Sequence, residues 1–156
     1  MTPIVHADAS FGRAVNPFAG GFVEYEQGAV CWAARKVKFV PQSSCEIETA
    51  AIVMMLKEAK FVLDIIEFYG AGVKGPMPVI TDNKAAYDIV KNPGATKRTA
   101  HFERWLHYAR DLYLRNAVTV LLTPTENMMA DAMTKATDRQ TFFRCRNYMM
   151  NIGRNA

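Results

Sequence analysis

The sequence predicts a single α/β domain in which helices pack on a mixed β-sheet, and two observations lead to this class. Three short strand-like segments come first, two of them joined as a hairpin, and helical segments then alternate with strand-like segments. This order is typical of a mixed sheet flanked by helices. The length of 156 residues fits one domain, residues 1–156, with a sizeable core.

The first half of the chain supplies three strands and a long helix. Residues 4–9 form a short β-prone run, and residues 20–25 and 29–33 form two more, joined by Glu26-Gln27-Gly28. A short glycine-containing connection between two such runs is typical of a β-hairpin. A helical pattern then extends from residue 43 to about residue 69, where a glycine-rich stretch ends it.

The second half alternates between helices and strands, separated by proline and glycine. Strands that are reached through helical crossovers are expected to lie parallel to their neighbours. The expected elements are a strand at 78–81, helices at 84–91 and about 100–115, a strand at 117–122, a helical run to about 135 and a last helix at 138–151.

The composition excludes several classes of protein. Cys31, Cys45 and Cys145 lie far apart without a Cys-x-x-Cys motif, which argues against a zinc site and a disulfide framework. No apolar run reaches the roughly 20 residues that a membrane helix needs, and the N-terminus lacks a signal-peptide layout. We therefore expect a soluble, intracellular domain. Lys and Arg outnumber Asp and Glu by 19 to 15, an excess that suits a polyanionic partner if several acids are sequestered.

The long helix carries two glutamates with different expected roles. Ser43-Ser44-Cys45-Glu46 has the form of a capping box, and helical phase places Glu46 on a polar stripe with Lys57 and Lys60. Glu48 instead shares its face with apolar residues, so its carboxylate points toward the sheet, where an unpaired charge costs several kcal/mol. A buried cation must satisfy it, unless it forms an ion pair or is exposed at the helix end. The apolar residues on its face are Ile52, Met55, Ala59, Val62 and Ile66.

Three further acids occupy unusual positions. Asp8 lies inside the first strand, where aspartate is disfavoured; the alternative is a wet or edge face. Asp82 ends a short strand, and although it could cap the next helix, Asn83 is able to do so instead. Asp131 is expected too far into a helix to cap it; the alternative is an exposed acid paired with Lys135 four residues on.

Together the four acids predict a divalent-metal site. They come from four separate segments, and clustered carboxylates repel each other unless hard cations neutralise them. Two magnesium ions roughly 3.5–4 Å apart are an established arrangement for phosphodiester hydrolysis. The expected ligands are Asp8, Glu48, Asp82 and Asp131.

At these residues the sequence resembles the ribonuclease H domain of copia-type LTR retrotransposon polyproteins, over about residues 6 to 136. The matching motifs in this chain are Ala7-Asp8-Ala9, Gly28-Ala29-Val30-Cys31-Trp32-Ala33-Ala34-Arg35-Lys36, Ser43-Ser44-Cys45-Glu46-Ile47-Glu48, Asp82-Asn83, Lys91-Asn92-Pro93, Arg98-Thr99-Ala100-His101, and Pro124-Thr125-Glu126 with Ala130-Asp131 and Thr134-Lys135. Three positions depart from the family pattern, namely Thr49, Glu103 and Trp105, and the loop at 123–127 lacks the histidine of retroviral relatives.

The resemblance implies a ribonuclease H-like fold, with a five-stranded mixed sheet of order 3-2-1-4-5 flanked by α-helices. It implies that Asp8, Glu48, Asp82 and Asp131 are catalytic, in an endoribonuclease that cuts the RNA strand of RNA–DNA hybrids and leaves 5′-phosphate and 3′-hydroxyl ends. Asp8 would bridge two Mg²⁺ ions, Glu48 and Asp82 would complete one site and Asp131 the other, and Mn²⁺ would be a substitute.

The expected context is a domain excised from a polyprotein, with residues 137–152 as a helical extension. The expected partners are an RNA–DNA hybrid and the reverse transcriptase polymerase domain of the same polyprotein, without a membrane. As an isolated domain it is expected to be a monomer, located in the cytoplasm, in retrotransposon particles or in the nucleus.

Six residues near the predicted site are candidates for nucleic-acid contacts, although the first of them is equally well explained as a helix cap. Trp105 and Tyr108 are expected to pack into the core rather than stack on bases. The candidate contacts are Ser43, Ser44, Asn83, Lys97, Arg98 and His101.

Two rival hypotheses remain at the level of sequence. The first is a catalytically silent ribonuclease H-like module that only binds nucleic acid or tethers a polymerase, against which the retention of all four acids argues. The second is a receiver-like domain that accepts a phosphoryl group, which fits the initial run of three strands poorly.

Overall fold

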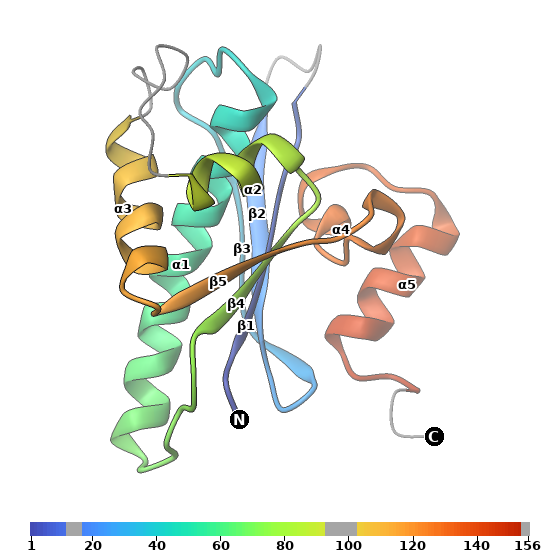
Figure 1. Ribbon diagram of the computed structural model, residues 1–156. Helices are drawn as coiled ribbons and strands as arrows, with labels where there is room; N and C mark the ends of the chain where they lie inside the picture. Colours follow the sequence, from blue (N-terminus) through green and yellow to red (C-terminus); the bar gives the residue numbers. More distant parts are fainter. Residues whose placement is uncertain (12–16, 93–102, 154–156) are drawn as a thin grey trace.

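The computed structural model describes residues 1–11, 17–92 and 103–153, and its centre is a five-stranded mixed sheet (Figure 1). The strand order is β3-β2-β1-β4-β5, which confirms the expected topology. β1 pairs with β2 and β2 with β3 in antiparallel fashion, whereas β1 pairs with β4 and β4 with β5 in parallel fashion. The strands are β1 (Ile4–Ala9), β2 (Phe18–Tyr25), β3 (Gly28–Lys36), β4 (Met77–Thr81) and β5 (Val118–Leu122).

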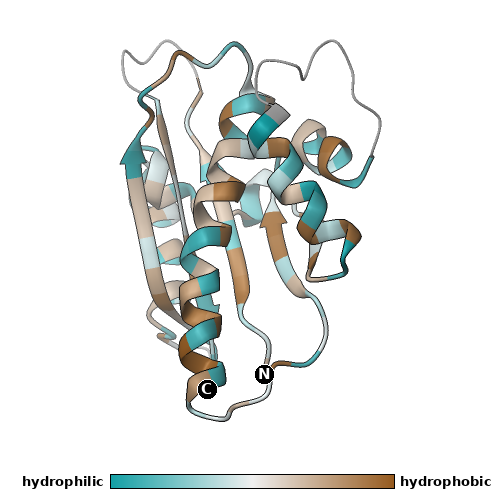
Figure 2. Cartoon of the chain, turned by 90° about the vertical axis from the view of Figure 1, so that its left-hand side faces the viewer, coloured by the Kyte–Doolittle hydropathy of each residue, from teal (hydrophilic) through white to brown (hydrophobic). Residues whose placement is uncertain are grey.

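Helices cover both faces of the sheet, with α1 and α3 on one side and α4 and α5 on the other (Figure 1). None of the helices in the described ranges is long and apolar enough to cross a membrane. Hydrophilic residues recur along the length of the helices (Figure 2). The helices are α1 (Ser44–Phe68), α2 (Lys84–Lys91), α3 (Glu103–Leu114), the 3-10 turn η2 (Thr125–Asn127), α4 (Asp131–Thr134) and α5 (Arg139–Met149).

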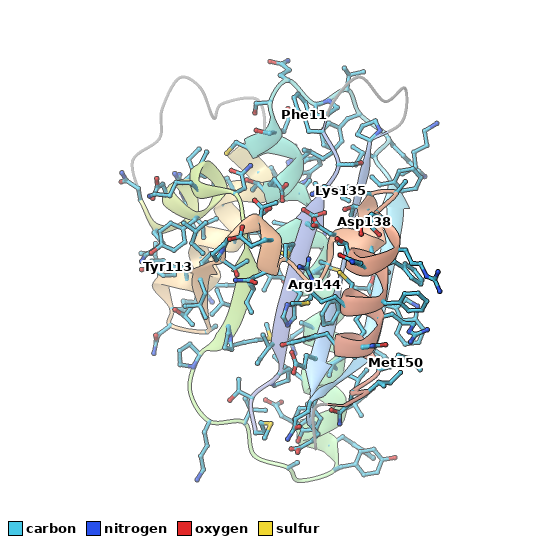
Figure 3. The ribbon with its side chains drawn as sticks, turned by 90° about the vertical axis from the view of Figure 1, so that its right-hand side faces the viewer. Phe11, Tyr113, Lys135, Asp138, Arg144 and Met150 are labelled. Atoms are coloured by element: carbon cyan, nitrogen blue, oxygen red, sulfur yellow. The ribbon has the colours of Figure 1, made fainter. Side chains whose placement is uncertain are left out.

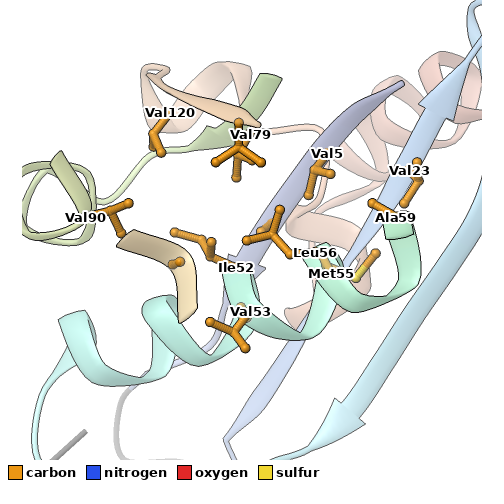
Figure 4. Packing of buried hydrophobic residues seen from close by; sticks show 14 of the residues in the cluster. Val5, Val23, Ile52, Val53, Met55, Leu56, Ala59, Val79, Val90 and Val120 are labelled. Carbon is orange, nitrogen blue, oxygen red and sulfur yellow. The ribbon is translucent and has the colours of Figure 1, made fainter. Parts of the chain in front are cut away.

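The larger core cluster lies between α1 and the sheet. Ile52 and Leu56 of α1 point toward Val5 of β1 and Val79 of β4 (Figure 4), and all four side chains are almost completely buried. The apolar stripe predicted for the long helix is therefore its buried face. Packing of this stripe fixes the rotation of α1 about its axis, and with it the direction of Glu48.

The start of α1 shows a modified capping box. Ser43 is the N-cap, and its hydroxyl accepts a hydrogen bond from the N–H of Glu46 at 3.2 Å. The Glu46 carboxylate accepts from the N–H of Gln42 at 2.7 Å, one residue before the N-cap. Glu46 is only 5% exposed, so the prediction that it lies on a solvated stripe was wrong. Its structural role in capping is confirmed.

The C-terminal part differs from the continuous helical run that we predicted as far as Lys135. It is divided into η2 and the single-turn α4, because the backbone at Met128 is extended, with φ −75° and ψ 105°. The break buries Met128 and Ala130 against Phe22 of β2, in a second apolar cluster. Asp131 is consequently the first residue of α4 and not a mid-helix residue.

Candidate metal centre

Three of the four predicted acids converge at one place. Asp8 lies in β1, Glu48 near the start of α1, and Asp82 directly after β4. One carboxylate oxygen of each lies within 4.8 Å of the others. Asp8 and Glu48 are buried, whereas Asp82 is partly exposed. The cluster therefore has a protein-facing side and a side open to solvent.

The parallel pairing of β1 and β4 brings Asp8 and Asp82 together. In that pair Val5 is the partner of Val79 and His6 that of Ile80, so both strands lead toward the same edge of the sheet. Ligand sites in open α/β sheets lie at this carboxyl edge. Beyond β4, the side chain of Asn83 caps α2 by accepting from the N–H of Ala86 at 2.9 Å. Asp82 is thus not needed as a cap, as we predicted.

The carboxylate of Glu48 lies in a strongly unfavourable electrostatic environment for an anion. Burial, followed by the charges of Asp8 and Asp82, raises its pKa to about 9, against the smaller opposing effect of Lys135. Its Oε2 atom is buried and has no hydrogen-bond partner among the described residues. Burial likewise raises the pKa of Asp8. A hard divalent cation with oxygen ligands fits this set of carboxylates, and it would keep them ionised.

The fourth acid, Asp131, is linked to Asp8 by Lys135, which contacts both carboxylates. The Nζ atom of Lys135 lies 2.8 Å from Oδ1 of Asp131 and 3.1 Å from Oδ1 of Asp8. The Thr134 hydroxyl donates a hydrogen bond to the other oxygen of Asp8. Lys135 lies where α4 ends, beside the strands of the sheet (Figure 3). The expected ion pair between Asp131 and Lys135 exists, but it is shared with Asp8 and Asp131 is buried.

Lys135 and Thr134 were not predicted as site residues. We considered Lys135 only as a local partner of Asp131 at i+4 spacing, and that spacing was the signal available. Although burial lowers the pKa of Lys135, its hydrogen bonds and charge contacts with Asp131 and Asp8 outweigh burial, so the pKa is raised. Lys135 therefore carries a positive charge into the group of acids.

The predicted nucleic-acid contacts divide into three groups. Ser43 and Asn83 are the N-caps of α1 and α2, and Ser44, the residue after Ser43, is exposed. Lys97, Arg98 and His101 lie outside the described residues.

Trp105 and Tyr108, both in α3, differ in their environment. Trp105 packs against Phe39 with ring centroids 4.7 Å apart, as expected for a core side chain. Tyr108 is 37% exposed, so the prediction that it packs into the core was wrong.

The chain has relatives among transposon polyproteins. It is 26% identical over 151 residues to the retrovirus-related Pol polyprotein from transposon RE2 of Arabidopsis thaliana, a match covering 95% of this chain. Over 124 residues it is also 26% identical to the Pol polyprotein from transposon RE1 of the same plant. The chain spans about a tenth of the length of these relatives. No protein-family model matches it.

Solved ribonuclease H structures have the same fold. The N-terminal RNase H domain of Rv2228c from Mycobacterium tuberculosis superposes with a TM-score of 0.66 at 11% identity, covering 94% of this chain and 96% of that one. LC11-RNase H1, isolated from compost by a metagenomic approach, gives 0.65 at 15% identity, covering 85% and 92%. LC11-RNase H1 in complex with an RNA/DNA hybrid gives 0.58 at 13% identity, covering 85% and 94%. At these identities the likeness establishes the fold.

Proposed function

Starting from a ribonuclease H-like domain whose relatives are transposon Pol polyproteins, we propose that this chain is a ribonuclease H. In this proposal it hydrolyses the RNA strand of RNA–DNA hybrids and leaves 5′-phosphate and 3′-hydroxyl ends. The reverse transcriptase polymerase domain of the same polyprotein is the proposed protein partner, because the relatives are Pol polyproteins.

The observation that carries the proposal is the convergence of three carboxylates, one of which has a buried oxygen without a hydrogen-bond partner among the described residues. Asp8, Glu48 and Asp82 each offer an oxygen within 4.8 Å of the others, and Oε2 of Glu48 has no partner in the described part of the chain. These three residues would hold one Mg²⁺ ion, and Asp8 with Asp131 a second. Bound Mg²⁺ supplies an activated water and stabilises the leaving oxygen.

The exposure of the acids supports one direction of approach for the phosphodiester in this proposal. Asp8 is buried and held from one side by the Thr134 hydroxyl, so its position is fixed by β1 and by α4. Asp82 is partly exposed, and this side of the cluster is where a phosphodiester can approach. Preorganised groups in a partly dry site act more strongly on developing charge than groups in water.

Two facts support an RNA–DNA hybrid as the substrate. With the acids of the cluster taken up by metal ions, the net charge of +4 leaves a positively charged surface that suits a polyanion, and the structural neighbour LC11-RNase H1 has been solved with an RNA/DNA hybrid. Recognition of a hybrid is expected to depend on the 2′-hydroxyl groups and on groove shape rather than on base identity. Little sequence preference should result.

A cleavage assay with end-labelled hybrid, single-stranded RNA and duplex DNA tests the proposal. In Mg²⁺ we expect cutting of the RNA strand of the hybrid alone, and no cutting in excess EDTA. Asp82→Asn should lower the rate by at least 100-fold, whereas Glu67→Gln, which changes an exposed acid of α1, should not change it. Hybrid binding by the wild type without any cleavage above the Asp82→Asn level would establish the silent module instead.

A further inference from the structure

The four acids form two parts that share Asp8, and these parts differ in their hydrogen-bond partners. The first part consists of Asp8, Glu48 and Asp82. There the Oε2 atom of Glu48 has no hydrogen-bond partner among the described residues. Between Asp8 and Asp131, by contrast, the ammonium group of Lys135 contacts one oxygen of each acid, at 3.1 Å and 2.8 Å. One part therefore has an unsatisfied ligand atom, and the other part contains a cation of the protein itself.

Lys135 is tethered and yet able to move away. Its backbone N–H donates to the carbonyl of Asp131, which fixes its Cα at the end of α4. Its side chain is 37% exposed, whereas those of Asp8 and Asp131 are 0% and 12% exposed. A lysine has a flexible four-carbon stem with a compact charged head. The ammonium group can thus exchange its carboxylate partners for water without any change in the helix.

We propose that Lys135 is a built-in counter-ion, which occupies the place of the second divalent ion between Asp8 and Asp131 and leaves when that ion binds. This inference rests on the proposed function, because it concerns the same two-ion centre. Oδ1 of Asp8 is bonded to Lys135 while its other oxygen accepts from Thr134. An ion between the same two carboxylates would meet the ammonium charge at close range, and like charges there repel.

Two consequences follow for the binding of ions. The centre fills in a fixed order, first at Asp8, Glu48 and Asp82 and then between Asp8 and Asp131. The second ion binds only to those molecules in which the Lys135 side chain has moved away. Its apparent affinity is therefore the intrinsic affinity multiplied by the fraction of such molecules. In the absence of any ion, Lys135 keeps Asp131 beside Asp8, so the site is held together before metal arrives.

Calorimetric titration of the full chain with Mn²⁺ alone, without nucleic acid, tests this. Mn²⁺ accepts the same carboxylate and water ligands as Mg²⁺. Relative to the wild type, Lys135→Met should tighten the second binding event about tenfold and leave the first within about twofold. Lys84→Met is the matched control, because Lys84 lies two residues from Asp82 and pairs with Asp88 but not with Asp8 or Asp131. It should change neither event.

Thermal unfolding supplies a second readout that does not depend on activity. In EDTA, Lys135→Met should unfold at a lower temperature than the wild type, and saturating Mn²⁺ should raise its midpoint by more than it raises that of the wild type. If Lys135→Met does not fold in EDTA, Lys135→Gln, which keeps hydrogen-bond donors without the charge, gives the same comparison.

The possible results separate the two proposals. A second event of unchanged affinity in Lys135→Met, equal tightening of both events, or the same tightening in Lys84→Met would overturn the displacement of Lys135 and leave the proposed nuclease intact. If wild-type protein binds no Mn²⁺ and Asp82→Asn behaves identically, the metal centre itself is wrong, and the proposed function fails with it.

Discussion

Gly20 of β2 lies directly opposite Asp8 of β1 in the antiparallel pair, and it leaves the space that Thr134 occupies. A Cβ atom at Gly20 would lie 3.2 Å from Cγ2 of Thr134 and 2.8 Å from the carbonyl oxygen of Ala33. The close approach of α4 to β1, and with it the contact between Thr134 and Asp8, therefore depends on a residue without a side chain.

Gly20→Ala should consequently disturb both stability and the site. We expect a loss of about 1–3 kcal/mol in the free energy of unfolding, the usual cost of overpacking, together with weaker Mn²⁺ binding. Urea denaturation and calorimetry measure the two effects. Gly28→Ala is the control, since the nearest atom to its Cβ would be 3.7 Å away. Full stability of Gly20→Ala would mean that α4 can move away from the sheet at no cost.

The raised pKa of Glu48 predicts that the metal-free protein becomes less stable as the pH rises. Below about pH 4.5 the carboxyl is protonated in both states, and between there and its folded pKa of about 9 only the unfolded chain releases the proton. The stability should therefore fall as the pH rises through this window, by at most about 1.4 kcal/mol per pH unit. Unfolding in EDTA between pH 5 and pH 9 measures the slope.

Glu48→Gln isolates this contribution. Because glutamine does not titrate, the variant should show a flatter profile and should be more stable than the wild type in EDTA at pH 8. Glu67→Gln, at an exposed position of the same helix, should follow the wild-type curve. Parallel profiles for Glu48→Gln and wild type would show that Glu48 is ionised in the metal-free protein.

Addition of Mg²⁺ should reverse the loss of stability that the metal-free protein shows as the pH rises. At a Mg²⁺ concentration one hundred times its Kd, binding to the folded state alone adds about 2.7 kcal/mol to the free energy of unfolding. Thermal unfolding at pH 8 with increasing MgCl₂ measures the gain. Asp82→Asn should lose most of it, and Asp64→Asn, which changes an exposed acid paired with Lys60, should keep it. An equal gain in both variants would indicate nonspecific ion binding.

Ser43 and Ser44 can be assigned separate roles by comparing two variants. The hydroxyl of Ser43 caps α1, so Ser43→Ala should cost about 1 kcal/mol of stability. Ser44 is exposed, so Ser44→Ala should change the stability by less than about 0.5 kcal/mol. Urea denaturation measures both. A rise in KM for hybrid in Ser44→Ala at unchanged stability would identify Ser44 as a substrate contact, and an unchanged KM would remove it from the candidates.

Helix α5 is held to the sheet by a partly buried polar contact. The Tyr148 hydroxyl donates to the Glu24 carboxylate at 2.8 Å, and Nε2 of His6 lies 3.0 Å from the same oxygen. Tyr148→Phe should cost about 1.5–3 kcal/mol, as expected for a hydrogen bond to a charged group, and should speed amide exchange in α5. Tyr69→Phe, at an exposed position, is the control. Unchanged exchange in α5 would show that this hydrogen bond does not hold the helix to the sheet.

The parts of the site that could be predicted from sequence depend on local pattern. The choice of Glu48 over Glu46 as a site residue follows from the phase of the apolar stripe on α1, and packing of that stripe is what directs Glu48 toward Asp8. The capping of α2 by Asn83 could be predicted because asparagine is a favoured N-cap residue at the start of a helix. The strand order, by contrast, came from the family resemblance and not from periodicity.

The missed features depend on contacts between distant segments. The break before Asp131 arises because burial of Met128 and Ala130 against Phe22 outweighs the helical propensity of the segment. Lys135 contacts Asp8 across 127 positions of sequence, a relationship that i+4 spacing does not reveal. Glu46 is buried because its carboxylate turns back to the chain at Gln42 rather than outward.

The contact between Thr134 and Asp8 joins positions 126 residues apart, and this has a consequence for synthesis of the chain. Domains generally fold as units during synthesis. The arrangement around Asp8 is completed only once α4 has left the ribosome. A nascent chain that ends before α4 should therefore lack the contacts that Thr134 and Lys135 make with Asp8.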